Sequence, residues 1–295
     1  MEQTCAIIGS GVAGLAAAVR MAAKGYKVSV FEKENMVGGK ISSLRLNAYR
    51  FDTGPSLLTM PELIDELFLL NGENPSDHFK AEAIPLSCKY FWEDGMIINA
   101  WQDTDRFASE IENNTNIKAA VVKDYLAYCR RLYELSGESF LFHSLHKASN
   151  YFRPAFRKTM LNAFRLDAFS SMHGRNSKWF PHPGIVQLFD RYATYNGSNP
   201  YKTPATLNMI AHLEHNAGAC FPEKGMYSIV ESIRDLGLRM GVQFFLKHKV
   251  ENILMQGRRA TGIRVNGEEI SFDVLISDVD IMPLYSELLP GEHIP

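Results

Sequence analysis

The order of hydrophobic and polar residues predicts a strand, a helix and a second strand at the start of the chain. The apolar run TCAIIG (4–9) has the length of a short buried strand. The alanine-rich run GLAAAVRMAAKG (14–25) favours a helix that Gly25 stops. The run YKVSVFE (26–32) alternates and is β-branched, as in a second strand. Together these segments predict a βαβ unit.

The two segments that follow also carry clear patterns. Residues 42–54, SSLRLNAYRFDTG, predict two strands joined by a tight turn. In residues 61–72, PELIDELFLLNG, apolar positions recur at helical spacing after a proline, which predicts a helix.

The pattern changes in the middle of the chain and then returns. Residues 81–220 are richer in aromatic residues and in polar helical stretches, and residues 124–145 predict a long helix. A helix is expected again at 226–241, followed by a strand at 242–246, two strands within 249–267 and one within 273–280.

These segments predict an α/β fold with two domains. We expect a Rossmann-like dinucleotide-binding domain, which is discontinuous and formed by residues 1–80 and 221–295. A second, inserted α+β domain, residues 81–220, is expected to take the substrate.

Composition excludes several classes of protein. A hydrophobic content of 46% and a charged content of 22% are those of a globular protein with a real core. The net charge of −2 argues against a nucleic-acid partner, because such domains are basic. The four cysteines show no regular spacing, which favours a reducing compartment. The apolar N-terminal run has no positive charge before it and is too short to span a bilayer, so we expect a cytoplasmic protein without a transmembrane helix.

The loop GSGVAG carries the first candidate chemistry. Gly9, Gly11 and Gly14 form a GxGxxG pattern between the expected strand and helix. This pattern allows a tight turn, close approach of a pyrophosphate, and close packing of helix on strand. Glu32 ends the next strand, where an acid can hydrogen-bond a ribose hydroxyl. The alternative is a glycine-rich turn with an ordinary surface glutamate, but the combined context favours dinucleotide binding.

The segment ENMVGGKISS after this acid resembles the GG motif of the flavoprotein superfamily that includes amine oxidases and carotenoid desaturases. The resemblance implies FAD as the cofactor. Gly38 and Gly39 would allow close backbone approach, and Lys40 would offer a cation to a phosphate or to an oxygen on the flavin side. A simple Gly-Gly turn with a solvated lysine is the alternative.

Four further segments resemble the phytoene desaturase family. Residues 49–61, YRFDTGPSLLTMP, are similar to the part that runs past the flavin, and the resemblance places Gly54 and Pro55 at a rigid turn beside the flavin ring. The others are 190–214, 221–233 and 250–280, where Val250 would contact adenine through its backbone.

The resemblance implies an FAD-dependent carotenoid desaturase that acts on a long, apolar, phytoene-like isoprenoid by hydride transfer to flavin. Arg191 and Tyr195 are candidates for residues near the flavin or the substrate. No general base and no electron acceptor can be identified. Family members are longer and return later to a glycine-rich segment, so the resemblance implies an N-terminal portion of such a protein. The alternatives are a flavin oxidase of the amine or protoporphyrinogen oxidase type, or an inactive fragment that binds nucleotide or lipid.

Two histidine pairs have the spacing of residues on one helix face, His143 with His146 and His212 with His215. Neither has convincing further ligands, so no metal site is predicted. The sequence contains no GxSxG motif, which a serine hydrolase of the α/β-hydrolase type would carry.

Residues 147–165 place an aromatic or methionine side chain at every fourth position among basic residues, namely Phe152, Phe156, Met160 and Phe164. Such a helix suits a membrane interface, where apolar side chains enter the lipid and cations meet headgroups. A core-facing helix with a basic outer face is equally supported. A peripheral contact with the inner membrane face is therefore an open hypothesis.

Overall fold

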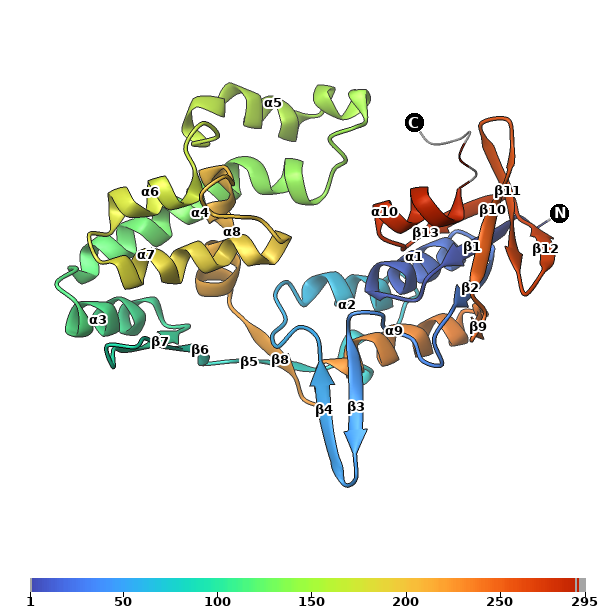
Figure 1. The fold of residues 1–295 in the computed structure, drawn as a ribbon, viewed down its shortest axis with the longest axis horizontal. Coiled ribbons are helices and arrows are strands. Elements are labelled where there is room, and N and C mark those ends of the chain that lie inside the picture. Colours follow the sequence, from blue (N-terminus) through green and yellow to red (C-terminus); the bar gives the residue numbers. More distant parts are fainter. Residues whose placement is uncertain (1, 290, 292–295) are drawn as a thin grey trace. The chain divides into compact units, whose positions relative to one another are not determined.

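The computed structural model describes residues 2–289 and 291, and Figure 1 labels the elements. Its contacts divide the chain into two compact units. Unit 1 comprises residues 1–82 and 221–295, and unit 2 comprises residues 83–220.

Unit 1 begins with the expected βαβ unit and hairpin, and further helices and strands of this unit follow unit 2 in the sequence. Its elements are β1 (Thr4–Ile8), α1 (Val12–Ala23), β2 (Lys27–Glu32), β3 (Ser42–Leu46), β4 (Tyr49–Thr53), α2 (Glu62–Leu69), η1 (Pro75–Asp77), α9 (Tyr227–Arg239), β9 (Gln243–Leu246), β10 (Val250–Gln256), β11 (Arg259–Val265), β12 (Glu268–Ser271), β13 (Val274–Ser277), α10 (Ile281–Pro283) and the π-turn η7 (Leu284–Leu288). The short strands β5 (Ala81–Ala83) and β8 (Cys220–Pro222) each extend one residue into unit 2.

A parallel sheet of order β13-β1-β2-β9 forms the centre of unit 1. Because side chains alternate along a strand, β1 buries residues on both faces of this sheet. Cys5 and Ile7 pack with Ala18 of α1, whereas Ala6 and Ile8 pack with apolar residues of the antiparallel sheet β10-β11-β12. Burial on both faces explains why β1 is a continuous apolar run.

Most sequence-predicted elements of unit 1 are confirmed. The hairpin pairs Ser42 with Thr53 and Leu46 with Tyr49, and its turn places Asn47 at a positive φ of 54°. The sequence does not predict β12, because EEIS (268–271) is short and polar and forms only by pairing with β11. 

Unit 2 consists of one hairpin and a set of helices. Its elements are β6 (Leu86–Phe91), β7 (Ile97–Trp101), α3 (Thr104–Asn114), α4 (Ala119–Leu141), η2 (Ala148–Phe152), α5 (Pro154–Leu161), η3 (Ala163–Arg165), α6 (Met172–Trp179), α7 (Pro183–Asp190), η4 (Arg191–Asn196), η5 (Ala205–Asn208), α8 (Met209–His212) and the π-turn η6 (Leu213–Ala217).

The core of unit 2 is aromatic. Tyr125 of α4 lies against Phe180 and Phe189, with ring centroids 4.8 and 4.4 Å away. Its hydroxyl donates to Asn176 at 2.8 Å, so the one polar atom of this buried ring is satisfied. The long helix expected at 124–145 is confirmed, although α4 begins earlier, at Ala119, and ends at Leu141.

Residues 147–165 do not form one helix, although the spacing of their aromatic and basic residues indicates one. The segment contains the short helices η2, α5 and η3, since Pro154 lacks the N–H needed in a helix interior and instead begins α5. Phe156 is buried at 3% exposure against Tyr151, while Phe152 and Phe164 are 84% and 77% exposed. The four expected positions therefore do not share one face.

Candidate functional site

The GxGxxG loop joins β1 to α1 in unit 1. Gly9 has a φ of 96°, and its N–H donates to the carbonyl oxygen of Phe31 at 2.9 Å. A Cβ on Gly14 would lie 2.4 Å from the Gly9 carbonyl oxygen, so glycine is required for the close packing of helix on strand. Gly11 is the N-cap of α1 and has no side chain to cap the helix. No N-cap side chain therefore covers the first N–H groups of α1, which can face an anion.

The Gly38-Gly39 pair packs directly on this loop. Gly38 N donates to the Ser10 carbonyl oxygen at 2.8 Å, and Gly38 forms an isolated parallel bridge with Gly11. Gly39 has a φ of 55°, and a Cβ there would lie 3.3 Å from Gly11 Cα. The GxGxxG loop and the Gly38-Gly39 pair are separated in the sequence, but together they form one surface of backbone atoms.

Lys40 and Gly54 continue the same surface. Gly54 has a φ of 128°, and a Cβ on it would lie 2.0 Å from the Lys40 carbonyl oxygen. Gly54 therefore lets the end of β4 approach the glycine pair. The Lys40 side chain and Pro55 are exposed, so both remain accessible to a ligand.

Glu32 lies at the end of β2 and is 7% exposed. Its Oε2 accepts from Ser10 N at 2.9 Å and from Ser10 Oγ at 2.7 Å, and its Oε1 accepts from Glu34 N at 3.0 Å. Two carboxylate oxygens offer about four acceptor positions. Glu32 therefore holds the glycine loop in place and still has capacity for a hydroxyl donor.

The sequence analysis does not single out Asp278, which follows β13. Because β13 pairs in parallel with β1, this residue reaches the glycine loop, and its N–H donates to the Ile8 carbonyl oxygen at 2.8 Å. The backbone N–H groups of Gly14 and Gly11 hydrogen-bond its carboxylate. Burial raises the pKa of Asp278, and these hydrogen bonds oppose that shift. The available signal was an acid at the carboxyl end of a parallel strand next to β1.

These contacts test whether the loop fits a dinucleotide. The start of α1 directs two N–H groups at an anionic oxygen, here that of Asp278, which is the chemistry a pyrophosphate needs. Bare glycine backbone surrounds that position, and Glu32 lies beside it. The residues therefore fit the phosphate and ribose parts of FAD. Val250 is 5% exposed in β10, opposite Val265, and its contact with adenine remains a prediction.

Replacing Glu32 with alanine should weaken FAD binding by roughly 1–3 kcal/mol, the scale for a lost hydrogen bond to a charged group. The loss combines a missing ribose acceptor with a less constrained Ser10. Titration of apoprotein with FAD measures the effect. Glu34→Ala, which removes an exposed acid two residues away, is the control and should bind FAD as the native chain does. Unchanged affinity in Glu32→Ala would show that this acid is not a ribose ligand.

In unit 2, the structure brings Arg191 and Tyr195 together on one buried carboxylate. Arg191 Nη2 lies 2.9 and 3.0 Å from the two carboxylate oxygens of Glu214, and Tyr195 Oη donates to Glu214 Oε2 at 2.6 Å. The Glu214 side chain is fully buried, and that of Arg191 is 31% exposed. Burial alone would raise the pKa of Glu214, but Arg191 and the hydrogen bonds hold it below its usual value. Arg191 also lines a hollow with Tyr90, Phe91 and Trp92.

The two histidines beside this cluster face different partners. His215 Nε2 lies 2.7 Å from Tyr192 Oη, and its ring stacks on Phe107 at 4.4 Å. His212 instead pairs with Asn216 at 2.8 Å. Within the described part of the chain, no three His, Cys, Asp or Glu side chains come together as metal ligands would.

The stability of unit 2 should fall by about 1–2 kcal/mol as the pH is lowered from about 6.5 to 5. Burial lowers the pKa of His215 from 6.5 to about 4. The unfolded chain takes up a proton in this range and the folded chain does not, so protonation favours unfolding. Glu214 has a lowered pKa and adds its loss only at lower pH.

Urea unfolding followed by tryptophan fluorescence measures this effect, because Trp92, Trp101 and Trp179 all lie in unit 2. His215→Gln should flatten the pH dependence. An equal slope in this variant would assign the effect to other groups, such as His212, whose pKa burial also lowers.

Comparison with known proteins identifies the family to which the chain belongs. Residues 12–293 match the family described as Flavin containing amine oxidoreductase. The chain is 40% identical to the 1-hydroxycarotenoid 3,4-desaturase of Flavobacterium sp. (strain P99-3) over 289 residues, which are 98% of this chain and 59% of that protein. It is 27% identical to the 4,4'-diapolycopene oxygenase of Methylomonas sp over 98% of this chain and 58% of that protein.

Among solved structures, putrescine oxidase bound to putrescine has a TM-score of 0.64 at 15% identity, covering 99% of this chain and 61% of that one. Identity at this level shows a shared fold alone, and it confirms the expected α/β flavoprotein fold. The chain spans 58–59% of the length of the two curated relatives.

Proposed function

The chain belongs to the flavin-containing amine oxidoreductase family, and its cofactor is FAD. We propose that it forms part of an oxidoreductase that desaturates a phytoene-like carotenoid chain. The observation that carries the proposal is the 40% identity, over 98% of this chain, to a 1-hydroxycarotenoid 3,4-desaturase. The resemblance to carotenoid desaturases seen in the sequence is thereby confirmed.

The backbone surface of unit 1 would hold the cofactor. Gly9 and Gly11 would leave room for the pyrophosphate at the start of α1, while Gly14 keeps helix and strand together. Glu32 would accept from the ribose, and the Lys40 cation would meet a phosphate or flavin oxygen. Gly39, Gly54, Pro55 and Val250 complete this proposed FAD site.

Bound FAD supplies the hydride acceptor, and the protein positions the polyene and keeps water away from it. We assign Arg191 and Tyr195 to the positioning of substrate. Glu214 holds their polar atoms. The hollow beside Arg191 has an aromatic wall of Tyr90, Phe91 and Trp92, and Glu93 and Asp94 also line it. 

A carotenoid substrate dissolves in lipid, so we also propose that the protein contacts a membrane peripherally. Several large apolar side chains of one segment of unit 2 are at least 64% exposed, namely Phe152, Met160, Leu161, Phe164 and Phe169. Basic residues lie between them in the sequence, as at an interfacial segment. Among the described residues, no helix has both the length and the apolar character needed to cross a bilayer.

The test begins with the colour of the purified protein. A preparation with flavin absorbance, or one that regains it with FAD, should convert detergent-dispersed phytoene or a hydroxylated carotenoid to products that absorb at longer wavelength. Oxidation of amines without extended conjugation would favour an oxidase of the amine or protoporphyrinogen type. A protein that cannot be loaded with FAD would favour a fragment that binds lipid or nucleotide only.

A further inference from the structure

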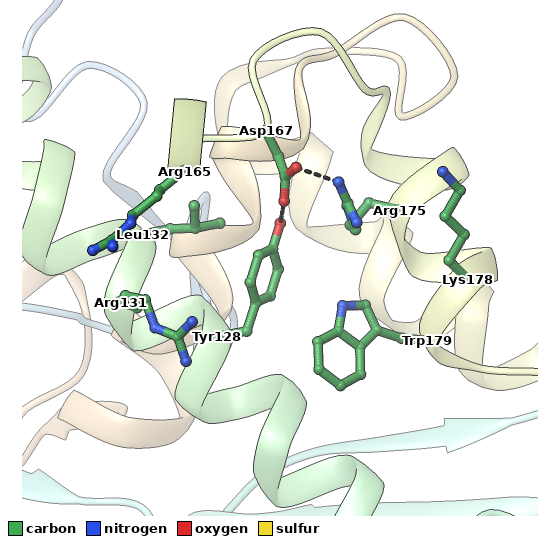
Figure 2. A pocket seen from close by; sticks show the side chains of 8 residues that line it. All are labelled: Tyr128, Arg131, Leu132, Arg165, Asp167, Arg175, Lys178 and Trp179. Carbon is green, nitrogen blue, oxygen red and sulfur yellow. Dashed lines mark hydrogen bonds and ion pairs between the residues drawn. The ribbon is translucent and has the colours of Figure 1, made fainter. Parts of the chain in front are cut away.

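A basic hollow of about 470 Å³ lies between α4 and the segment that runs from η3 through α6. Figure 2 shows the side chains that line it, which are Tyr128, Arg131, Leu132, Arg165, Asp167, Arg175, Lys178 and Trp179. We call it the basic pocket. All of these residues belong to unit 2, and none of them is part of the proposed cofactor site.

The positive charge of the basic pocket exceeds what the protein neutralises. Asp167 is its one carboxylate, and it pairs with Arg175 and accepts from Tyr128 Oη at 2.9 Å. In the described part of the chain, the remaining three cations of the pocket have no carboxylate partner; these are Arg131, Arg165 and Lys178. All three are exposed. 

Arg175 adds a further donor. Its Nε is buried and has no hydrogen-bond acceptor among the described residues. Buried polar groups are nearly always paired, so the donor set here is not saturated by the protein. A ligand with several anionic oxygens, such as a phosphate group, matches this combination of planar and point cations.

Aromatic side chains lie in the pocket and next to its residues in the sequence, and they favour contact with lipid over contact with water. Tyr128 and Trp179 form an aromatic wall, with ring centroids 5.7 Å apart. Phe164 and Phe169 flank the pocket residues Arg165 and Asp167 in the sequence, and they are 77% and 104% exposed. Aromatic rings with nearby cations are typical of the membrane interface.

We propose that the basic pocket binds the phosphate of an anionic phospholipid headgroup, while Phe164 and Phe169 enter the acyl region beside it. The excess of three cations gives the charge complementarity. The exposed Phe164 and Phe169, which are sequence neighbours of pocket residues and are called the rim here, favour a lipid over a free anion. The proposal rests on the peripheral membrane contact described above, and it names the lipid chemistry that this contact requires.

The test is sedimentation with vesicles of phosphatidylcholine alone and of phosphatidylcholine mixed with phosphatidylglycerol. The native chain should bind the anionic vesicles more tightly. Arg131→Gln combined with Arg165→Gln should weaken that binding roughly 10- to 30-fold, since each basic residue near an anionic surface contributes about fivefold. Binding to the neutral vesicles should change little.

The matched control is Lys89→Gln combined with Lys202→Gln, which removes the same charge from exposed positions of unit 2 outside the pocket. An equal loss in both double variants would show that net charge alone attracts the membrane, and this would overturn the pocket. Unchanged binding in the arginine variant would overturn it as well. Thermal unfolding verifies that both variants remain folded.

A second variant tests the rim. Phe164→Ser with Phe169→Ser should reduce binding to both vesicle types, and in the native chain brominated acyl chains should quench tryptophan fluorescence through Trp179. Inorganic phosphate that binds the pocket without any vesicle binding would overturn the lipid assignment. Vesicle binding requires neither flavin nor carotenoid, so its failure is distinguishable from failure of the proposed desaturase function.

Discussion

Replacing Gly11 with valine should leave the purified protein without flavin. The backbone at Gly11, with φ of −63° and ψ of 173°, suits any residue, so the substitution does not strain the backbone conformation. Its effect comes from space. A Cβ there would lie 2.3 Å from Asp278 Oδ2, at the position where the first N–H groups of α1 face an anion. The valine side chain would occupy the place of the pyrophosphate.

Flavin absorbance per protein, with and without added FAD, measures this loss. We expect the fold to persist, because Asp278 can turn aside. Ala23→Val adds bulk at the exposed far end of the same helix, and this variant should retain its full complement of noncovalently bound FAD. A Gly11→Val protein that carries a full complement of FAD would contradict the assignment of this loop.

Replacing Arg191 with methionine should destabilise unit 2 by roughly 3–5 kcal/mol, the range for breaking a buried ion pair. The Glu214 side chain is fully buried and would lose its cation together with two hydrogen bonds. The pKa of Glu214 should then rise, because the hydrogen bond from Tyr195 would oppose the effect of burial less strongly than Arg191 and Tyr195 do together. Urea unfolding monitored by the tryptophans of unit 2 gives the free energy.

Two further variants interpret that result. Arg130→Met breaks an exposed pair with Glu134 and should change stability by less than about 1 kcal/mol. Combining Arg191→Met with Glu214→Gln removes the stranded charge and should recover much of the stability. A small loss in the single variant, with no recovery in the double variant, would show that the pair is structurally unimportant.

The sequence points to the glycine loop and Glu32 as a candidate cofactor site because their signals are local. The glycine loop, the strand before it and Glu32 lie within one βαβ unit, where turn chemistry and strand pattern suffice. Asp278 escapes such reasoning, since only the parallel pairing of β13 with β1 brings it to the loop. 

Unit 2 is harder to predict for the same reason. Arg191 and Tyr195 are candidates from the sequence, but their common partner Glu214 lies in a separate π-turn. Spacing alone groups Phe156 with Phe152 and Phe164 on one helix face, whereas Phe156 packs against Tyr151 and is buried and the other two are exposed. Local periodicity cannot decide which face of a short helix meets the core.

The strand order β13-β1-β2-β9 also has a consequence for how the chain folds during synthesis. β1 and β2 are made first, yet their outer neighbours β9 and β13 are made only after all of unit 2. Unit 2 is one continuous stretch, so it can fold as soon as residue 220 has left the ribosome. The central sheet must wait for residues 243–277, with a large loop-closure cost. β1 is translated before unit 2 but gains its partner β13 only afterwards, so its apolar side chains and the glycine loop wait longest for their final packing.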